Sequence, residues 1–224
     1  MHISRKIICF IFWGITTMTI TAFKESSPFY AMLKLVSPYD TDLGKYNIGV
    51  LILSIGISIS FLCYLVQMID EQFRMSGYIL VRGKREFVFS KLIHKSWLGI
   101  VELFFVKLLV DILLSQAKGW ENVFIAIGIE CSTLLTVIMW SLIIYLLFQM
   151  GVNVRWIYFI MMLAIILLQY ASAYLSPLSF FVFGSPDILE KPIVWIIIKI
   201  TITAGIFCLN KKIYPLYEYI GNNE

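Results

Sequence analysis

The sequence predicts an all-α polytopic membrane protein, a bundle of six transmembrane helices with an amphipathic coupling helix on the cytoplasmic side. Three observations lead to this fold class: long apolar runs, short charged connectors between them, and a composition that is 60% hydrophobic and only 14% charged. Soluble domains are about 45–50% apolar. A chain of 224 residues has room for one such bundle, so residues 1–224 are expected to form a single transmembrane domain.

Six apolar runs are long enough to cross a bilayer. A spanning helix needs about 20 mostly apolar residues, because the hydrocarbon layer is about 30 Å thick and a helix rises about 1.5 Å per residue. The first run follows Arg5 and Lys6, as the apolar part of a secretory signal would, but it is longer than such a part usually is, and we expect a retained span. The six runs are residues 7–23, 47–68, 96–114, 123–148, 156–174 and 193–209.

Lysine and arginine are distributed unequally between the two sides of these spans. The N-terminal end, the 70–95 and 149–155 connectors and the C-terminal tail carry all five arginines, whereas the other connectors carry only lysines. Cytoplasmic loops of membrane proteins are enriched in Lys and Arg. We therefore expect both termini and the 70–95 connector in the cytoplasm, and the protein in the cell (inner or cytoplasmic) membrane.

The sequence offers little catalytic or metal-binding chemistry. His2 and His94 are its only histidines, which excludes a histidine-based metal centre or a Ser–His pair within the membrane. Gly77 and Gly83-Lys84 approach a P-loop, but the spacing is one residue too long and Arg85 stands where a Ser or Thr is needed. We expect no catalytic residue, metal or cofactor in this chain.

The 70–95 connector carries the clearest functional pattern. Taken as a helix, its later part separates an apolar face from a basic face, as a helix lying along the inner membrane surface would. The apolar face comprises Phe89, Leu92, Ile93 and Trp97, and the basic face comprises Lys84, Lys91 and Lys95. The alternative is a plain interfacial elbow that leads into the third span.

The segment from Tyr78 to Leu92 reads Tyr-Ile-Leu-Val-Arg-Gly-Lys-Arg-Glu-Phe-Val-Phe-Ser-Lys-Leu. In its sequence and its place between the second and third of six spans, it resembles the connector of type-2 ABC transporter permeases. The resemblance implies a coupling helix that docks on a separate ABC ATPase subunit, which would hold the ATP and Mg²⁺. The coupling residues that it implies are Arg82, Gly83, Lys84, Arg85, Phe87, Phe89 and Lys91.

The same resemblance implies the assembly and the substrate. The permease would act as a dimer with a second copy or a related permease in the lipid bilayer, and would export a peptide or amphipathic substrate. Small permeases of this kind serve bacteriocin and lantibiotic export and self-protection. The family also has an extracellular excursion before the last span, in which Phe180, Phe181 and Phe183 are placed to dip into the interface.

Ionisable residues inside the spans form a second pattern. Lys107, Asp111, Glu130 and Lys199 fall at one depth, about 18–24 Å from the inner edge. Each costs about 2.5–3.5 kcal/mol at the centre of a spanning helix, so such groups face the bundle interior and find partners. Two interpretations are open: a charged layer that lines the substrate path, and structural ion pairing that fixes helix register.

Two other functions stay open from the sequence. An ion-coupled secondary transporter or channel would bind an ion directly through the charged layer, independently of ATP. A non-transporting immunity or receptor protein would capture a peptide at the outer face.

Overall fold

The computed structural model describes residues 39–40, 45–46, 48–80, 85–115, 123–172, 178, 181 and 192–213. These residues form five helices and two short strands, in the order β1 (Tyr39–Asp40), β2 (Lys45–Tyr46), α3 (Ile48–Leu80), α4 (Arg85–Ser115), α5 (Val123–Gln149), α6 (Val154–Ser172) and α7 (Pro192–Ile213). The strands pair antiparallel over two residues each. The helical fold class is confirmed, while the predicted first span, residues 7–23, lies outside the described residues.

Each of the other five predicted spans coincides with a helix. Within the described residues, three helical segments are long and apolar enough to cross a membrane: Glu130–Gln149, Val154–Ala171 and Ile193–Ile213. Their outward faces support a membrane location. Large apolar side chains that a soluble protein would bury are exposed along α6 and α7, including Trp156, Phe159, Leu167, Ile193 and Ile197.

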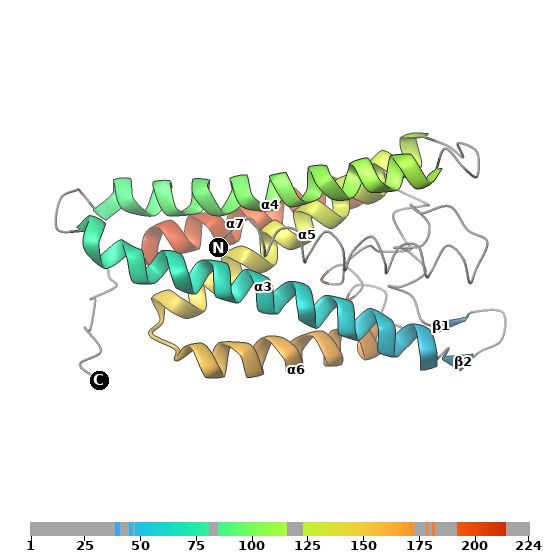
Figure 1. Ribbon diagram of the computed structural model, residues 1–224, viewed down its shortest axis with the longest axis horizontal. Helices are drawn as coiled ribbons and strands as arrows, with labels where there is room; N and C mark the ends of the chain where they lie inside the picture. The colour runs from blue at the N-terminus through green and yellow to red at the C-terminus, as the bar shows by residue number, and fades with distance from the viewer. Residues whose placement is uncertain are drawn as a thin grey trace.

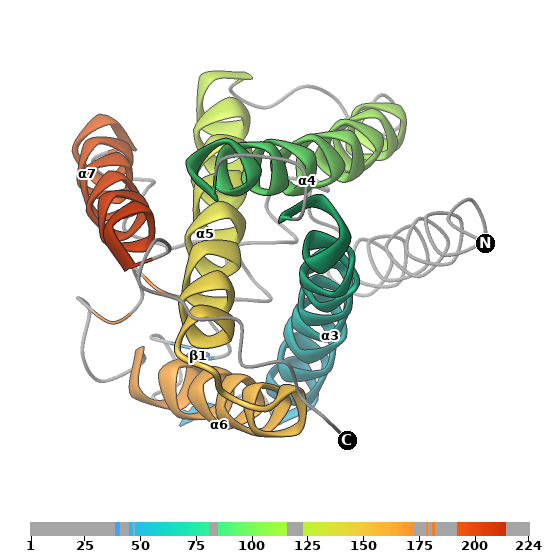
Figure 2. The ribbon, with the colours of Figure 1, turned by 90° about the vertical axis from the view of Figure 1, so that its left-hand side faces the viewer.

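The helices lie side by side along the long axis of the molecule (Figure 1). Figure 2 shows α5 in the middle, with α7 on one side and α3 and α4 on the other. α5 is the most buried of the three apolar segments and makes its most extensive contact with α7, while α3 also packs against α6. α5 and α7 run in the same direction, because Lys199 bonds near Ser132 and Asn210 bonds near Leu142.

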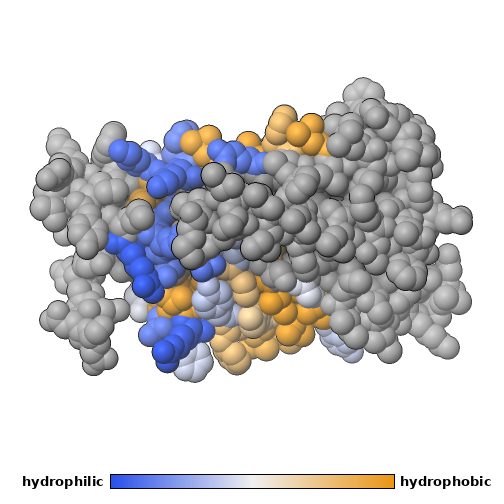
Figure 3. All heavy atoms as spheres, in the orientation of Figure 1, coloured by the Kyte–Doolittle hydropathy of each residue, from blue (hydrophilic) through white to orange (hydrophobic). Residues whose placement is uncertain are grey.

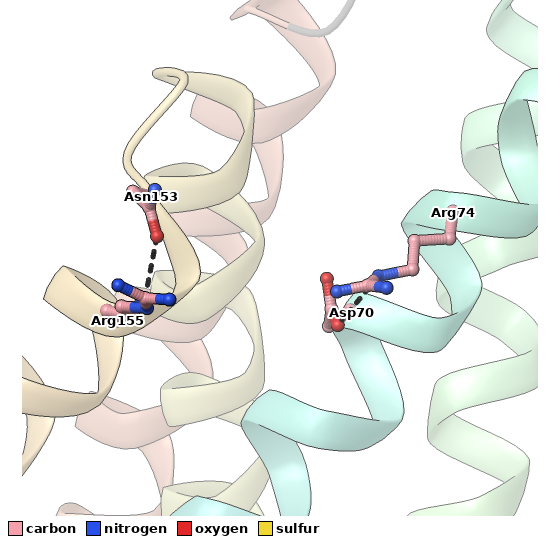
Figure 4. A network of polar contacts seen from close by, with 4 residues as sticks. All are labelled: Asp70, Arg74, Asn153 and Arg155. Atoms are coloured by element: carbon pink, nitrogen blue, oxygen red, sulfur yellow. Dashed lines mark hydrogen bonds and ion pairs between the residues drawn. The ribbon is translucent and has the colours of Figure 1, made fainter. Parts of the chain in front are cut away.

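The turn between α5 and α6 follows from its sequence. Gly151 has φ 74°, a conformation that glycine adopts without the steric penalty of a side chain. Its N–H donates to the carbonyl of Phe148 and the N–H of Val152 donates to that of Leu147, which closes α5 with a Schellman motif. Asn153 then caps α6, because its Oδ1 accepts the N–H of Arg155 at 3.0 Å (Figure 4).

α3 and α4 are longer than a membrane span. They contain 33 and 31 residues, which corresponds to about 50 and 46 Å, against about 30 Å of hydrocarbon. Together they form a helical hairpin whose tip reaches beyond the neighbouring ends of α5, α6 and α7 (Figure 1). A separate surface helix is therefore not what the structure has: the predicted amphipathic segment forms the first turns of α4.

Hydrophilic side chains gather toward this end of the molecule, and a more apolar band follows (Figure 3). The exposed basic residues at this end of the described chain include Arg74, Lys91, Lys95, Arg155 and Lys211. Arg74 forms an ion pair of 3.0 Å with Asp70, one turn earlier on α3 (Figure 4). The hairpin tip therefore lies at the basic end, which the sequence assigns to the cytoplasm.

Candidate functional site: a projecting hairpin and two buried polar clusters

The predicted coupling residues belong to the segment that joins α3 to α4 in the sequence and to the start of α4. Arg82, Gly83 and Lys84 fall outside the described residues, between the end of α3 and the start of α4. Arg85 and Phe87 lie on the first turn of α4, and the structure describes their helical backbone only. Lys91, two turns further on, is exposed.

Phe89 does not fit the predicted role of a docking side chain. It is 3% exposed, and its ring lies 6.3 Å from that of Phe207 on α7. Trp97 approaches the same Phe207 ring at 5.8 Å. The apolar face of this segment is thus covered by the protein's own helices rather than by the membrane surface.

The amphipathic pattern itself is confirmed. Leu92 and Ile93 on the apolar face are buried, whereas Lys91 and Lys95 on the basic face are exposed. This segment does not form a separate surface helix, because α4 continues without interruption into the region predicted as the third span. Its apolar face stays directed into the bundle, so burial against α7 replaces burial in lipid.

Lys199 is the best defined member of the predicted charged layer. Its side chain is 1% exposed, and its Nζ donates to Ser132 Oγ and Thr136 Oγ1, both at 2.7 Å, and to the Ser132 carbonyl at 3.4 Å. Thr136 Oγ1 in turn donates to that carbonyl at 3.0 Å. The ammonium group is therefore solvated by oxygen atoms of α5, as a buried charge requires.

The remaining members of the layer occupy two places. Glu130 is 7% exposed and lies on α5, two residues before Ser132, the residue that accepts a hydrogen bond from Lys199. Lys107 and Asp111 lie on the later half of α4, where only the backbone is described. A common layer of Lys107, Asp111, Glu130 and Lys199 therefore stays a prediction.

A second polar cluster joins three helices nearer the basic end. Gln72 of α3, Ser96 of α4 and Tyr145 of α5 are all buried. The Ser96 and Tyr145 hydroxyls each reach Gln72 Oε1 at 2.6 Å, and they also lie within hydrogen-bond distance of each other. The Leu92 carbonyl offers a further acceptor, at 3.1 Å from Ser96 Oγ and 3.3 Å from Tyr145 Oη. This cluster ties the hairpin to the central helix.

The sequence did not point to this second cluster. Its members are 24 and 49 residues apart along the chain, and Gln, Ser and Tyr are ordinary residues in such a sequence. The only usable signal was polarity within helical apolar stretches, which selects many other positions as well. For Lys199 the sequence found the charge but not its acceptors, although Gly128 and Ser132 had the spacing of a close helix contact.

The segment between α6 and α7 also contacts the bundle. The Trp140 indole N–H on α5 donates to the Phe181 carbonyl at 2.9 Å. Phe181 is half-buried against the apolar core, while Phe180 and Phe183 lie outside the described residues, so the approach of these side chains to the membrane interface stays a prediction. No protein-family model, curated protein or solved structure matches the chain.

Proposed function

We propose that this chain is the membrane-spanning permease subunit of an ABC transporter. The observation that carries the proposal is the α3–α4 hairpin, which projects at the basic end of the bundle and whose two helices are joined in the sequence by the segment that contains Arg82, Gly83 and Lys84. A rigid projecting element is suited to transmit the closure of an ATPase pair into the membrane helices. The ATPase, with its ATP and Mg²⁺, is supplied by a separate chain.

The buried clusters support a mechanical role for the hairpin, in which its movement is transmitted to α5 and α7. Because Gln72 and Ser96 both bond to Tyr145, a displacement of the hairpin tip acts directly on α5. α5 in turn holds Lys199 of α7 through Ser132 and Thr136. These contacts form a continuous connection from the ATPase-facing tip to the charged residues at bilayer depth.

The remaining features of the proposal follow the family. The permease acts as a dimer in the cell membrane, with both termini in the cytoplasm, and exports a peptide or amphipathic substrate. Glu130 and Lys199 contribute to the lining of the substrate path. Lys107 and Asp111 of α4 belong to the same predicted charged layer.

The experiment that tests the proposal replaces Arg82, Arg85 and Phe87 together by Ala. We expect the variant to insert and fold normally, but to lose stimulation of ATP hydrolysis by substrate and ATP-driven transport in reconstituted vesicles. Replacement of Lys212, exposed at the same end on α7, by Ala is the matched control and keeps both. Wild-type transport in the triple variant would refute the docking role.

One observation favours a second candidate function, an ion-coupled transporter. Glu130 and Lys199 are buried ionisable groups at bilayer depth, and such groups often mark ion or proton pathways. Transport driven by an ion gradient in vesicles without ATP, and lost in Glu130→Gln, would support this candidate over the ABC permease.

A further inference from the structure

Gln149, the last residue of α5, combines deep burial with an unsatisfied amide. The side chain is 4% exposed, and among the described residues neither its Nε2 nor its Oε1 has a hydrogen-bond partner. A buried amide normally forms hydrogen bonds, because leaving it without them is unfavourable relative to water. Gln149 therefore requires an explanation that simple helix packing does not provide.

Its position relates it to the cluster on the central helix. Gln149 follows Tyr145 by four residues, so the two side chains share a face of α5 and are separated by about 6 Å along the axis. Tyr145 is the residue that contacts Gln72 and Ser96 of the hairpin. The same face of α5 thus carries two polar side chains one turn apart, and only that of Tyr145 contacts the Gln72–Ser96 pair.

We propose that the α3–α4 hairpin slides along α5 by one helical turn, transferring the Gln72–Ser96 pair from Tyr145 to Gln149. The direction is toward the basic end, because Gln149 lies closer to that end than Tyr145. The proposal rests on the proposed function, in that the ATPase drives the slide through the hairpin tip. One-turn shifts of this kind are a known form of switching between packed elements.

The hairpin is built to move as a unit. Ser96 Oγ donates to Gln72 Oε1 at 2.6 Å, which joins α3 to α4 directly. The helices also approach closely near this bond, since a Cβ at Gly99 would lie 3.4 Å from Met68 Sδ. A displacement of one helix therefore carries the other with it.

A one-turn slide exchanges apolar contacts for similar ones. Moving the hairpin by four residues places Met68 and Ile100 opposite Tyr145, in place of Gln72 and Ser96. In the same way Ile69 replaces Phe73, whose ring now stacks on Phe148 with the centroids 5.1 Å apart. The slide therefore keeps an apolar interface and leaves the Tyr145 hydroxyl without these partners instead of the Gln149 amide. The observed and the shifted packing each leave one buried polar side chain without a hydrogen bond to the Gln72–Ser96 pair. The two packings are therefore close in free energy, as a switch requires.

Two substitutions bias this equilibrium in opposite directions. Gln149→Leu removes the amide that would bind the Gln72–Ser96 pair after the slide, and so favours the observed packing. We therefore expect ATP-driven transport to fall about tenfold or more. Tyr145→Phe removes the hydroxyl that binds the Gln72–Ser96 pair in the observed packing. It therefore favours the shifted packing, and the hairpin should shift without ATP. Gln149→Leu is not expected to lower the melting temperature, since it removes an unsatisfied buried amide.

The slide is measured directly as a distance between spin labels. With the four native cysteines replaced by serine, labels at the exposed positions Leu109 of α4 and Met150 after α5 report the movement. Trapping the complex with ATP and vanadate should shorten this distance by about 5 Å, close to one helical turn. A control pair at Met150 and Leu167, which lies on α6, should not change.

The outcomes separate the slide from the proposed function. A shortened 109–150 distance in isolated Tyr145→Phe permease supports the slide even if no ATPase binds the wild-type chain. A shift in the trapped wild type that disappears in Gln149→Leu supports both. The slide is overturned if the 109–150 distance is unchanged in both the trapped complex and Tyr145→Phe. It is also overturned if Gln149→Leu transports as well as the wild type. In either case the ABC transporter proposal would then depend on ATPase binding alone.

Discussion

At the residue scale, Lys199 shows how the chain accommodates a buried lysine on a helix long and apolar enough to cross a membrane. Two hydroxyls and a carbonyl from successive turns of α5 accept hydrogen bonds from its Nζ. Both hydroxyls belong to small side chains, so α5 and α7 approach closely enough for the lysine to span the gap. The side chain thereby fixes the register of two parallel helices as well as contributing a charge.

This arrangement predicts a coupling between Lys199 and Thr136. Lys199→Met and Thr136→Val should each lower the free energy of unfolding by about 1–3 kcal/mol, because each removes a hydrogen bond to a charged group. The double variant should lose clearly less than the sum, since the bond is already absent in either single variant. Thermal unfolding of the purified protein in detergent measures the four species.

Thr201→Val is the matched control for this cycle. Thr201 is exposed on α7, and its hydroxyl donates to the Ile197 carbonyl within the same helix. Its combination with Lys199→Met should be additive. Additive behaviour of Lys199→Met and Thr136→Val as well would contradict the bonded contact.

Residue-scale prediction from the sequence was limited for a physical reason. The charge rule identifies Glu130 and Lys199 as inward-facing, and both are buried. It cannot identify the acceptors, because Ser132 and Thr136 are equally compatible with exposure to lipid. Contacts between residues distant along the chain depend on the helix arrangement, which one sequence does not specify.

At the element scale, the uninterrupted run of α4 from Arg85 to Ser115 determines what the connector does. A span predicted from hydropathy ends where charged residues begin, but the helix has no reason to end there. Lys and Glu are good helix formers, and residues 84–96 contain no glycine or proline. The sequence therefore predicted the positions of these five helices well and the extent of α3 and α4 poorly.

The burial of Phe89 leads to a prediction that separates stability from coupling. Phe89→Ala should lower the free energy of unfolding by about 3–5 kcal/mol, because it removes a buried ring that faces Phe207. Lys91→Ala, two residues later on the exposed face, should change stability by less than about 0.5 kcal/mol. The readout is thermal unfolding in detergent. A Phe89→Ala variant as stable as the wild type would show that the ring is available to a partner.

At the scale of the whole molecule, charge and hydropathy both vary along its long axis. The hydrophilic residues gather at the end that bears the hairpin tip, and the apolar band follows (Figure 3). β1 and β2 lie toward the opposite end (Figure 1). The lysine and arginine bias predicts an orientation of the bundle with the hairpin in the cytoplasm.

This orientation is testable by labelling of single cysteines in a chain whose native cysteines are replaced by serine. A membrane-impermeant maleimide added to intact cells should label Ile193→Cys, exposed at the start of α7, and not Lys212→Cys, exposed near its end. Inverted vesicles should give the reverse pattern. Labelling of position 212 in intact cells would place the hairpin outside and exclude docking of a cytoplasmic ATPase.

The central claim is that the projecting hairpin binds a separate ATPase, and purification of the native complex in mild detergent tests it most directly. Mass spectrometry should identify a P-loop ATPase present at about one copy per permease chain, and the ATPase should be lost from the Arg82, Arg85 and Phe87 triple-alanine variant. A stable oligomer of this chain that contains no ATPase would contradict the claim, and the buried Glu130 and Lys199 would then be the residues to examine for ion coupling.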